Sequence, residues 1–316
     1  MKKEKEYIFF GTGTIAARIL EELEKADLLP TVIVTSPDAP AGRKLELTPS
    51  AVKKWADARG IQTLQPDKLD TAFISSLLAF HCSLFVVADY GKILPQALLD
   101  IPPRGVINVH PSLLPRLRGP SPIRSAILSE KETGVTIMLV DAKMDHGPIL
   151  AQKKIDIAWP PRASELEEVL AREGGRLLAF ILPRWTAEEI VAQEQNHDLA
   201  TYCHFLKKED GQLDLSNAHE SFLKIRAFEG WPGTFAYFER SGLNRAKGAV
   251  GPRATDSLGL ARTDSQSESV LGKKIRVQIL DAHLEGEKLV IDRVKPEGKN
   301  EMDYAEFVRS GATPSL

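Results

Sequence analysis

The sequence predicts an α/β protein with a doubly wound, mostly parallel Rossmann-like sheet, followed by a smaller β-rich domain. In the first half, apolar runs of strand length alternate with amphipathic helical segments. In the second half, short alternating runs are separated by Gly and Pro, which is typical of antiparallel strands and small barrels. The chain has 316 residues and so exceeds one typical domain. We expect a first domain over residues 1–183, a linker over 184–206 and a second domain over 207–316.

Each element of the first domain follows from its local pattern. The apolar run Tyr7–Phe10 ends at Gly11, which predicts a buried strand followed by a helix over Thr14–Lys25. A helix expected over residues 163–182 has Leu, Val and Ile at helical spacing and closes the domain. The other strands are expected over residues 31–35, 84–88, 106–110 and 134–140, and the other helices over residues 49–59 and 123–129.

The second domain is expected to contain strands over residues 234–238, 274–279 and 288–294. Between the first two, residues 242–272 are rich in Ser, Thr, Asp, Gly and Arg and poor in large apolar residues. This composition favours a mobile insertion, to which we assign no chemistry. The polar stretch after Pro183 predicts the linker between the domains.

Composition is ordinary for a globular protein, with 43% hydrophobic and 27% charged residues. The 41 Lys and Arg against 43 Asp and Glu give a net charge of −2, which neither demands nor excludes a nucleic-acid partner. Cys82 and Cys203 lack the spacing of metal ligands, so we expect reduced thiols and no metal site. No signal peptide is evident, and no apolar run approaches the roughly 20 residues that span a bilayer. We expect a soluble, cytoplasmic chain with no membrane partner.

The most informative feature is Asn108-Val109-His110 at the end of a predicted buried strand, with Asp145 after the next strand. Side chains alternate along a strand, so Asn108 and His110 should project from one face, roughly 6–7 Å apart. Pro111 ends the strand, and the carboxyl ends of strands in α/β sheets face ligand-binding crevices. For any single residue, a polar patch satisfied by loop backbone is the simpler explanation. The three together favour a catalytic site.

These residue types suit the transfer of an acyl group to an amine. No Ser or Cys is placed as a nucleophile, so we expect direct transfer without a covalent enzyme intermediate. An amide donor and an imidazole can stabilise the oxyanion of a tetrahedral intermediate. The carboxylate of Asp145 can hold the imidazole and take a proton from the attacking amine, directly or through water. The residues by themselves do not specify the acyl group or the amine.

Two further segments are candidates for binding anions. Gly11-Thr-Gly-Thr-Ile-Ala16 matches the G-x-G-x-x-A pattern of dinucleotide sites, but no acidic residue ends the second expected strand. This favours a tight turn whose helix N-terminus faces an anionic group of a ligand. The long polar loop over residues 37–49 carries Arg43 and Lys44, which either bind phosphates or are simply solvated.

Two turns should border the same crevice as His110. Residues 87–91 follow the central strand, where Gly91 permits a close approach to the backbone and Tyr90 offers a flat ring. An ordinary turn at the end of a strand explains this segment equally well. Asp141 follows the later strand that leads to Asp145.

The run Asn-Val-His-Pro-Ser-Leu-Leu-Pro over residues 108–115, together with Asp145, resembles the signature of formyltransferases that use 10-formyltetrahydrofolate. Arg118-Gly119 and residues 132–138 are similar to the stretch that joins the parts of this signature. The loop over residues 37–49 and the segments that begin Lys207-Lys-Glu-Asp-Gly and Arg226-Ala-Phe-Glu-Gly resemble methionyl-tRNA formyltransferases in particular. The resemblance covers nearly the whole chain.

The resemblance implies formyl transfer from 10-formyltetrahydrofolate to the amino group of methionine on initiator tRNA, with an OB-like second domain. Asn108 and His110 would polarise the formyl group, while Asp145 would support His110 and proton removal. We also expect a monomer. The implied folate contacts are Val87, Ala88, Asp89, Tyr90, Gly91, Ser112, Leu113, Leu114, Pro115 and Asp141. The implied tRNA contacts are Arg43, Lys44, Lys207, Lys208, Lys273, Lys274 and Arg276.

The chain departs from the family pattern at several positions. Asp89 stands where a small apolar residue is common, which bears on the folate pocket, and Leu45-Glu46-Leu47 makes the loop less basic. Residues 207–316 carry 17 Lys and Arg and 17 Asp and Glu, so a basic face there requires an uneven distribution. None of these departures touches the catalytic set.

Three other functions are also compatible with the sequence. A sugar-nucleotide or other small-amine formyltransferase would use the same catalytic set without tRNA. A nicotinamide-dependent dehydrogenase would use the loop from Gly11 to Ala16 and would bind NAD or NADP rather than folate. A non-catalytic RNA-binding module would keep its role after the loss of the three polar residues.

Overall fold

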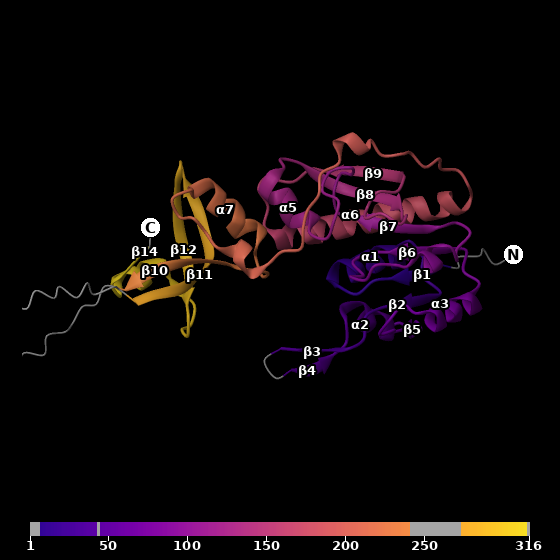
Figure 1. Cartoon of the computed structure of the whole chain (residues 1–316), viewed down its shortest axis with the longest axis horizontal. Coiled ribbons are helices and arrows are strands. Elements are labelled where there is room, and N and C mark those ends of the chain that lie inside the picture. Colours follow the sequence, from indigo (N-terminus) through magenta and orange to yellow (C-terminus); the bar gives the residue numbers. More distant parts are fainter. Residues whose placement is uncertain (1–6, 43–44, 241–272, 315–316) are drawn as a thin grey trace, which may run out of the picture. The chain divides into compact units, whose positions relative to one another are not determined.

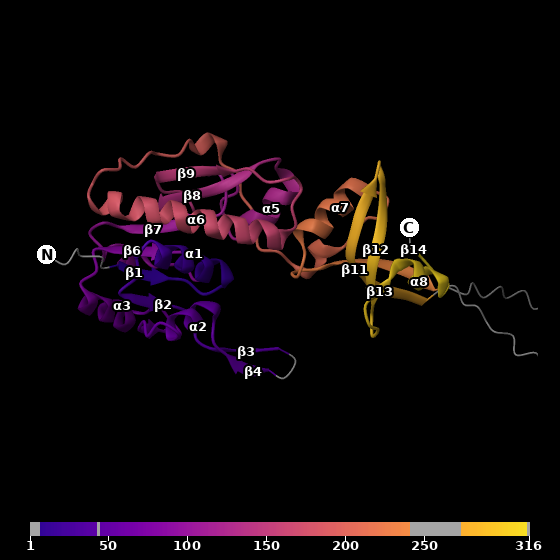
Figure 2. The ribbon, with the colours of Figure 1, turned by 180° about the vertical axis from the view of Figure 1, so that it is seen from behind.

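The computed structural model describes residues 7–42, 45–240 and 273–314 of the chain. It divides into two compact units, Met1–Leu206 and Lys207–Leu316. Figures 1 and 2 show the elements from opposite sides. The insertion expected over residues 242–272 lies outside the described residues.

A seven-stranded sheet forms the centre of the first unit, in the order β5-β2-β1-β6-β7-β8-β9. The strands from β5 to β7 pair in parallel, whereas β8 is antiparallel to β7 and β9 is antiparallel to β8. The predicted doubly wound, mostly parallel sheet is therefore confirmed. The strands are β1 (Tyr7–Phe10), β2 (Val32–Val34), β5 (Thr63–Leu64), β6 (Leu84–Val87), β7 (Val106–His110), β8 (Thr133–Leu139) and β9 (Ile149–Ile155).

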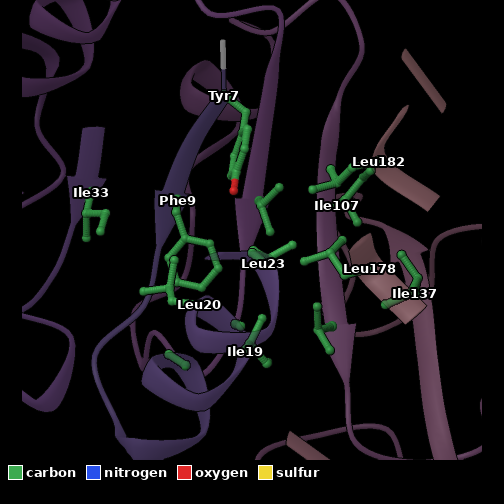
Figure 3. Packing of buried hydrophobic residues seen from close by; sticks show 14 of the residues in the cluster. Tyr7, Phe9, Ile19, Leu20, Leu23, Ile33, Ile107, Ile137, Leu178 and Leu182 are labelled. Carbon is green, nitrogen blue, oxygen red and sulfur yellow. The ribbon is translucent and has the colours of Figure 1, made fainter. Parts of the chain in front are cut away.

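Helices cover both faces of this sheet, so alternate residues of β1 enter two different cores. Tyr7 and Phe9 join the core beneath α1, α2 and α6, and Ile8 and Phe10 join the core beneath α3 and α4. Figure 3 shows the first core, where side chains of α1 and α6 meet those of β1 and β7. The helices are α1 (Thr14–Lys25), α2 (Ala51–Asp57), α3 (Thr71–Leu77), α4 (Gln96–Leu99), α5 (Pro122–Ser129) and α6 (Ala163–Thr186).

Two adjacent glycines allow α6 to approach its neighbours closely. A Cβ atom at Gly174 would lie 2.9 Å from Val109 Cγ1, and one at Gly175 would lie 2.7 Å from Glu22 Cβ. Contacts this short leave no room for a side chain in a close-packed interior. The glycines therefore fix the distance from α6 to both α1 and β7, the strand on which the candidate site is built.

The segment expected to be a linker, residues 184–206, instead belongs to the first unit. Backbone hydrogen bonds of 2.7 and 2.8 Å join Ile149 and Gln193, and Arg118 pairs with Tyr202 in a parallel bridge. Main-chain groups make these attachments, and composition says nothing about main-chain pairing. The second unit begins at Lys207, where the second domain was expected to begin, and residues 184–206 extend the first unit beyond residue 183.

The long polar loop of the first unit contains a short hairpin formed by β3 (Ala39–Ala41) and β4 (Glu46–Thr48). These strands pair in antiparallel fashion, so the loop has regular structure at its base. Arg43 and Lys44, the basic residues expected near its tip, lie outside the described residues.

The second unit is β-rich, as predicted, with one antiparallel sheet of five strands in the order β13-β12-β11-β10-β14. Its core joins Phe238 and Val277 of the sheet to Ile225 of α7 and Phe307 of α8. The elements are α7 (Ala218–Ala227), β10 (Thr234–Arg240), β11 (Lys273–Glu285), β12 (Lys288–Pro296), β13 (Met302–Asp303), α8 (Tyr304–Arg309) and β14 (Ala312–Pro314).

Three features of the described residues concern membranes, thiols and metals. In this part of the chain no helix is both long and apolar enough to cross a membrane. Cys82 and Cys203, both within this part of the chain, form no disulfide. Over the same residues, no group of three or more His, Cys, Asp and Glu side chains is placed to hold a metal ion.

Candidate active site

Strand β7 carries Asn108 and His110 to the carboxyl edge of the parallel strands. Asn108 lies beside Val87 of β6 on one side and Met138 of β8 on the other. Asn108 and His110 both border a cleft of about 520 Å³, and Asp145 borders the same cleft. The structure thus brings together the three side chains expected to form the catalytic set.

The contacts of His110 define its tautomer. Its ring is buried, and Nε2 lies 2.9 Å from the carbonyl oxygen of Leu117. A carbonyl only accepts hydrogen bonds, so Nε2 carries the proton and donates it. The other ring nitrogen, Nδ1, faces Asp145, whose Oδ1 is 3.6 Å away. This separation is within the range of an ion pair but is too long for a hydrogen bond.

The backbone after β8 turns sharply and directs the Asp145 carboxylate into the cleft. Oδ2 of Asp145 accepts a 2.8 Å hydrogen bond from the backbone N–H of Gly119. The φ angle of Asp145 is 50°, in the left-handed region that residues other than Gly seldom adopt. At Gly147 a Cβ atom would lie 2.0 Å from the carbonyl oxygen of Leu139, so the turn admits only glycine there.

Asn108 is half-buried, and its side chain makes no hydrogen bond within the described part of the chain. A primary amide carries two N–H donors and one carbonyl acceptor, which here stay available to a ligand. The cleft therefore combines a free amide donor, an imidazole of defined tautomer and a carboxylate. That combination can stabilise an oxyanion and accept a proton.

Most of the remaining cleft wall was not predicted from the sequence. Ile93, Met144 and Phe205 give it an apolar rim, with exposures of 86%, 51% and 74%. These residues reach the cleft from loops, and hydrophobic periodicity says nothing about the course of a loop. Gly13, Thr14 and Ile15 also border the cleft and belong to the segment Gly11–Ala16, which the sequence suggested as a turn facing a ligand. The other unpredicted lining residues are Lys92, Val109, Pro111, Gly119, Pro120, Ser121, Pro122, Ile123, Arg124 and Glu167.

Only some of the residues expected to contact folate line the cleft. Asp89 and Gly91 border the cleft. The ring of Tyr90 is 3% exposed and packs edge-on against Phe10, and burial raises the pKa of Tyr90 to about 12. The flat ring expected in the crevice is therefore part of the core. The described residues that line the cleft do not include the other expected folate contacts, which are Val87, Ala88, Tyr90, Ser112, Leu113, Leu114, Pro115 and Asp141.

Several of these residues support the site from behind. Ser112 Oγ donates a 2.7 Å hydrogen bond to the carbonyl of Arg116, and the N–H of Leu114 donates to Thr136 Oγ1 at 3.2 Å. Such bonds order the loop that leads to Leu117, whose carbonyl oxygen accepts the hydrogen bond from His110. Asp141 instead pairs with His146, with Oδ2 and Nδ1 2.7 Å apart.

Asp89 occupies the N-terminus of α1, where the sequence suggested a site for an anionic ligand. Its carbonyl oxygen accepts from the N–H groups of Thr12 at 3.0 Å and Gly13 at 3.4 Å, and its carboxylate accepts from the N–H of Ala16. Burial, followed by the charge of Glu167, raises the pKa of Asp89 to about 6, against the lowering effect of the Ala16 N–H. The chain's own carboxylate thus takes the place of a phosphate, which argues against a dinucleotide site.

The cations expected to contact tRNA are located in part by the structure. Arg276 stacks over the ring of Phe235, with its guanidinium carbon 3.8 Å from the ring centroid. Lys295, which the sequence did not single out, lines a hollow of about 180 Å³ with Arg276. Exposed side chains are found at Lys207, Lys208 and Lys274. The side chain of Lys273, like Arg43 and Lys44, lies outside the description.

Comparison with known proteins agrees with both units. A family model described as formyl transferase matches residues 5–182, and one described as formyl transferase, C-terminal domain, matches residues 206–311. Methionyl-tRNA formyltransferase of Chloroflexus aurantiacus is 44% identical over 246 residues, which cover 77% of this chain and 79% of the relative. The enzyme of the same name from Acidithiobacillus ferrooxidans is 36% identical over 316 residues, covering 98% of this chain and 96% of the relative.

Solved structures agree at the level of the fold. Methionyl-tRNA formyltransferase from Clostridium thermocellum aligns with a TM-score of 0.56 at 15% identity, covering 92% of this chain and 98% of that one. A sugar N-formyltransferase from a Shewanella species gives the same TM-score, 0.56, at 19% identity, covering 81% and 99%. Structural likeness alone does not separate the two substrate classes. The two family models and the sequence relatives together show that this chain belongs to the formyl transferase family, and within it to the methionyl-tRNA formyltransferases.

Proposed function

We propose that the protein transfers a formyl group from 10-formyltetrahydrofolate to the amino group of methionine carried by initiator tRNA. The observation that carries the proposal is the meeting of Asn108, His110 and Asp145 in one cleft. Sequence relatives at 36–44% identity that bear the name methionyl-tRNA formyltransferase support the choice of amine. The product would be the formylated methionyl-tRNA used to initiate translation.

The side chains suggest how the transfer proceeds. The amine lone pair attacks the formyl carbon, and the carbonyl oxygen becomes an oxyanion. The amide of Asn108 and Nδ1 of His110, when that nitrogen is protonated, donate hydrogen bonds to this oxygen. Asp145 accepts the proton that the amine loses. The bond between the formyl carbon and the folate nitrogen then breaks, and tetrahydrofolate leaves with a proton in place of the formyl group.

The cleft has the size and the lining that a folate requires. Its volume of about 520 Å³ falls within the usual range of roughly 300–1,000 Å³ for small-molecule sites. The exposed apolar side chains of Ile93, Met144 and Phe205 offer contact to flat rings, and Asp89 and Gly91 border the same space. The formyl donor acts as a cosubstrate here, since it is consumed in each turnover.

One face of the second sheet offers a surface suited to RNA. In the strand register, Phe235 is opposite Gln278 and Tyr237 is opposite Arg276, so these side chains share a face. Gln278 is also opposite Lys295, which adds a second cation to this face. Phe235 is buried beneath Arg276, so Tyr237, which is 40% exposed, is the ring that a base can reach. An exposed aromatic ring beside cations is a combination that binds bases and phosphates. An uneven distribution of this kind can attract tRNA although the domain is neutral overall.

The deciding experiment is a transfer assay with 10-formyltetrahydrofolate and methionine charged on initiator tRNA. Methionine charged on elongator tRNA and an amino-sugar nucleotide serve as competing amines. We expect rapid transfer to the initiator tRNA alone. Transfer to the sugar nucleotide without any to tRNA would contradict the proposal and select a small-amine formyltransferase.

A pair of matched variants tests the proposed chemistry. Replacing Asp145 by Asn removes the proton acceptor, and we expect turnover to fall by about 10²-fold or more. Asp156→Asn makes the same change at an exposed carboxylate outside the cleft lining and should leave turnover unchanged. Equal activities of the two variants would rule out a role for Asp145 in proton transfer.

A further inference from the structure

Arg118 is a buried cation held by neutral partners. It is 1% exposed, and its Nε and Nη2 donate to Gln195 Oε1 at 3.2 and 2.6 Å. Nη2 also lies 2.9 Å from His197 Nδ1, and Nη1 lies 3.3 Å from the hydroxyl of Tyr202. Within the described residues it forms no ion pair with a carboxylate. A buried charge without an opposite charge costs stability, so a role in function explains the arrangement better than a role in folding.

Gln195 connects this cation to the turn that carries Asp145. Its side chain is buried, and its Nε2 donates to the carbonyl oxygens of Asp145 at 3.0 Å and Gly147 at 2.7 Å. A guanidinium only donates and a carbonyl only accepts, so the amide has one orientation that satisfies all four contacts. Arg118 therefore determines which way the Gln195 amide points.

The two carbonyls that Gln195 binds belong to the strained residue itself and to the second residue after it. Asp145 adopts a left-handed φ of 50°, and backbone in this region persists only where surrounding contacts hold it. The next residue, His146, stacks on His197 with ring centroids 4.0 Å apart and 6° between the planes. The segment that contains Gln195 and His197 therefore contacts the turn through two hydrogen bonds and one stacked ring. The Asp145 carboxylate, held by the Gly119 N–H, faces His110 on the other side.

We propose that Arg118 and Gln195 are positioning residues that hold the backbone of Asp145 in the conformation needed for proton transfer. They act through Asp145 and do not touch the substrate. The inference rests on the proposed function, because it assigns to Asp145 the role of proton acceptor. It adds that the segment after α6, expected from the sequence to be a linker, is part of the catalytic apparatus.

Gln195→Glu separates positioning from folding. The substitution keeps the size of the side chain and strengthens the contact with Arg118 by turning it into an ion pair. It replaces the N–H donor by a carboxylate oxygen that repels the carbonyls of Asp145 and Gly147. The fold should survive, while the turn loses the donor that holds it.

Gln193→Glu is the matched control for this variant. Gln193 lies two positions earlier on the same segment and is exposed, and its hydrogen bonds to Ile149 come from the backbone. The same change of charge is thus made where no carbonyl depends on the side chain. We expect kcat of Q195E to be about 10–100-fold below that of Q193E, because a displacement of about 1 Å at a reacting group has an effect of this size. KM values for both substrates should agree within about threefold.

A double-variant cycle with Asp145→Asn provides the sharper readout. If Gln195 acts only through the carboxylate of Asp145, Q195E should have little further effect in the D145N background. A role in overall stability would instead lower the activity of wild type and D145N by the same factor. Equal factors, or a kcat for Q195E within threefold of Q193E, would overturn the inference. Should Q195E fail to fold, Arg118→Lys, which removes the two-point contact with the amide, is taken through the same cycle.

The transfer assay with the wild-type protein distinguishes failure of the proposed substrate from failure of the positioning role of Gln195. If wild type formylates an amino-sugar nucleotide and no tRNA, the proposed substrate is wrong, and the cycle is measured with the sugar. Coupling between Gln195 and Asp145 on that amine would still support the positioning role. Additive effects on methionyl-tRNA would overturn the positioning role and leave the proposed function standing.

Discussion

The cleft is bordered by two turns that both follow parallel strands. The polar groups of one turn are hydrogen-bonded within the protein, and those that the other turn presents to the cleft make no such bond in the part of the chain that the structure describes. At the turn between β1 and α1, the N–H groups of Thr12, Gly13 and Ala16 are used by the carbonyl and the carboxylate of Asp89. At the end of β7, the amide of Asn108 makes no side-chain hydrogen bond within the described residues, and Nδ1 of His110 has only a distant carboxylate. The first turn is satisfied internally, while the second keeps its polar groups for a ligand.

This difference shows that a motif offering donors is not yet a binding site. The G-x-G-x-x-A pattern presents free N–H groups at a helix N-terminus, which in other proteins bind phosphate. Here one residue from the neighbouring strand end supplies the negative charge instead. Whether donors remain free depends on what the fold places next to them.

The largest expected effect is at the turn after β7, whose polar groups are left for a ligand. Asn108→Ala removes an oxyanion donor, and turnover should fall by about 10²–10³-fold, equivalent to about 3–4 kcal/mol of transition-state stabilisation. Single-turnover formyl transfer measures this. Asn300→Ala removes the same side chain at an exposed position of the second unit and should have no such effect. Activity of N108A within a few-fold of wild type would remove Asn108 from the mechanism.

The next largest effect is expected at the turn between β1 and α1, whose N–H groups bond to Asp89. A Cβ atom at Gly13 would lie 2.0 Å from Asp89 Oδ2, so Gly13→Ala must displace the carboxylate that fills the helix N-terminus. We expect a loss of about 1–3 kcal/mol in the free energy of unfolding, measured by urea denaturation. The loss should be smaller when G13A is made in a D89A background, because the clashing group is then absent. Equal losses in both backgrounds would show that Asp89 does not occupy this position.

A smaller, pH-dependent effect sharpens the comparison. The pKa of Asp89 is about 6 in the fold, above its ordinary value of 3.8, so the folded state holds a proton that the unfolded state has lost. The contribution of Asp89 to stability is therefore fully present below about pH 4 and is lost as the pH rises through 6. Asn cannot ionise, so Asp89→Asn should gain stability relative to wild type over this range. The residue as a whole is exposed at the cleft although its carboxylate packs against the N-terminus of α1, so solvent screens the effect and we expect about 1 kcal/mol.

Thermal unfolding of both proteins between pH 4 and 7 checks this expectation. Asp156→Asn, at an exposed acidic residue outside the cleft, is the control. A constant difference between D89N and wild type across the range would contradict the assigned cause.

The smallest effect extends the comparison to the second unit, where Arg276 is half-buried and stacks over Phe235 at the edge of a hollow. Arg276→Ala should weaken the affinity for initiator tRNA by a few-fold and lower the slope of log affinity against log salt by about one unit or less. Folate-dependent turnover at saturating tRNA should be unchanged. Lys299→Ala, which removes an exposed cation outside the hollow lined by Arg276, is the control. An unchanged salt dependence would exclude a phosphate contact at Arg276.

The strands and the meeting of Asn108, His110 and Asp145 in one cleft could be predicted because their signals are local. Val106, Ile107 and Val109 form a buried apolar run, and the period of two along a strand puts Asn108 and His110 on one face. The alternation of strands and helices then implies a parallel sheet, whose carboxyl ends meet at one edge. Asp145 follows the next strand of the sheet, and that strand lies beside β7. Short-range pattern and a general rule of topology were therefore sufficient for these residues.

Other features depended on contacts between segments far apart in the chain. By itself the sequence determined the α/β class, the β-rich second unit and the three polar residues at the strand ends. Only the tertiary structure decided that Asp89 fills the first turn, that Tyr90 points into the core and that Gln195 reaches Asp145. The physical reason is that hydrophobic periodicity specifies which face of an element is buried. Which distant N–H or carbonyl a polar side chain meets depends on the folded course of the loops, and no local pattern records that.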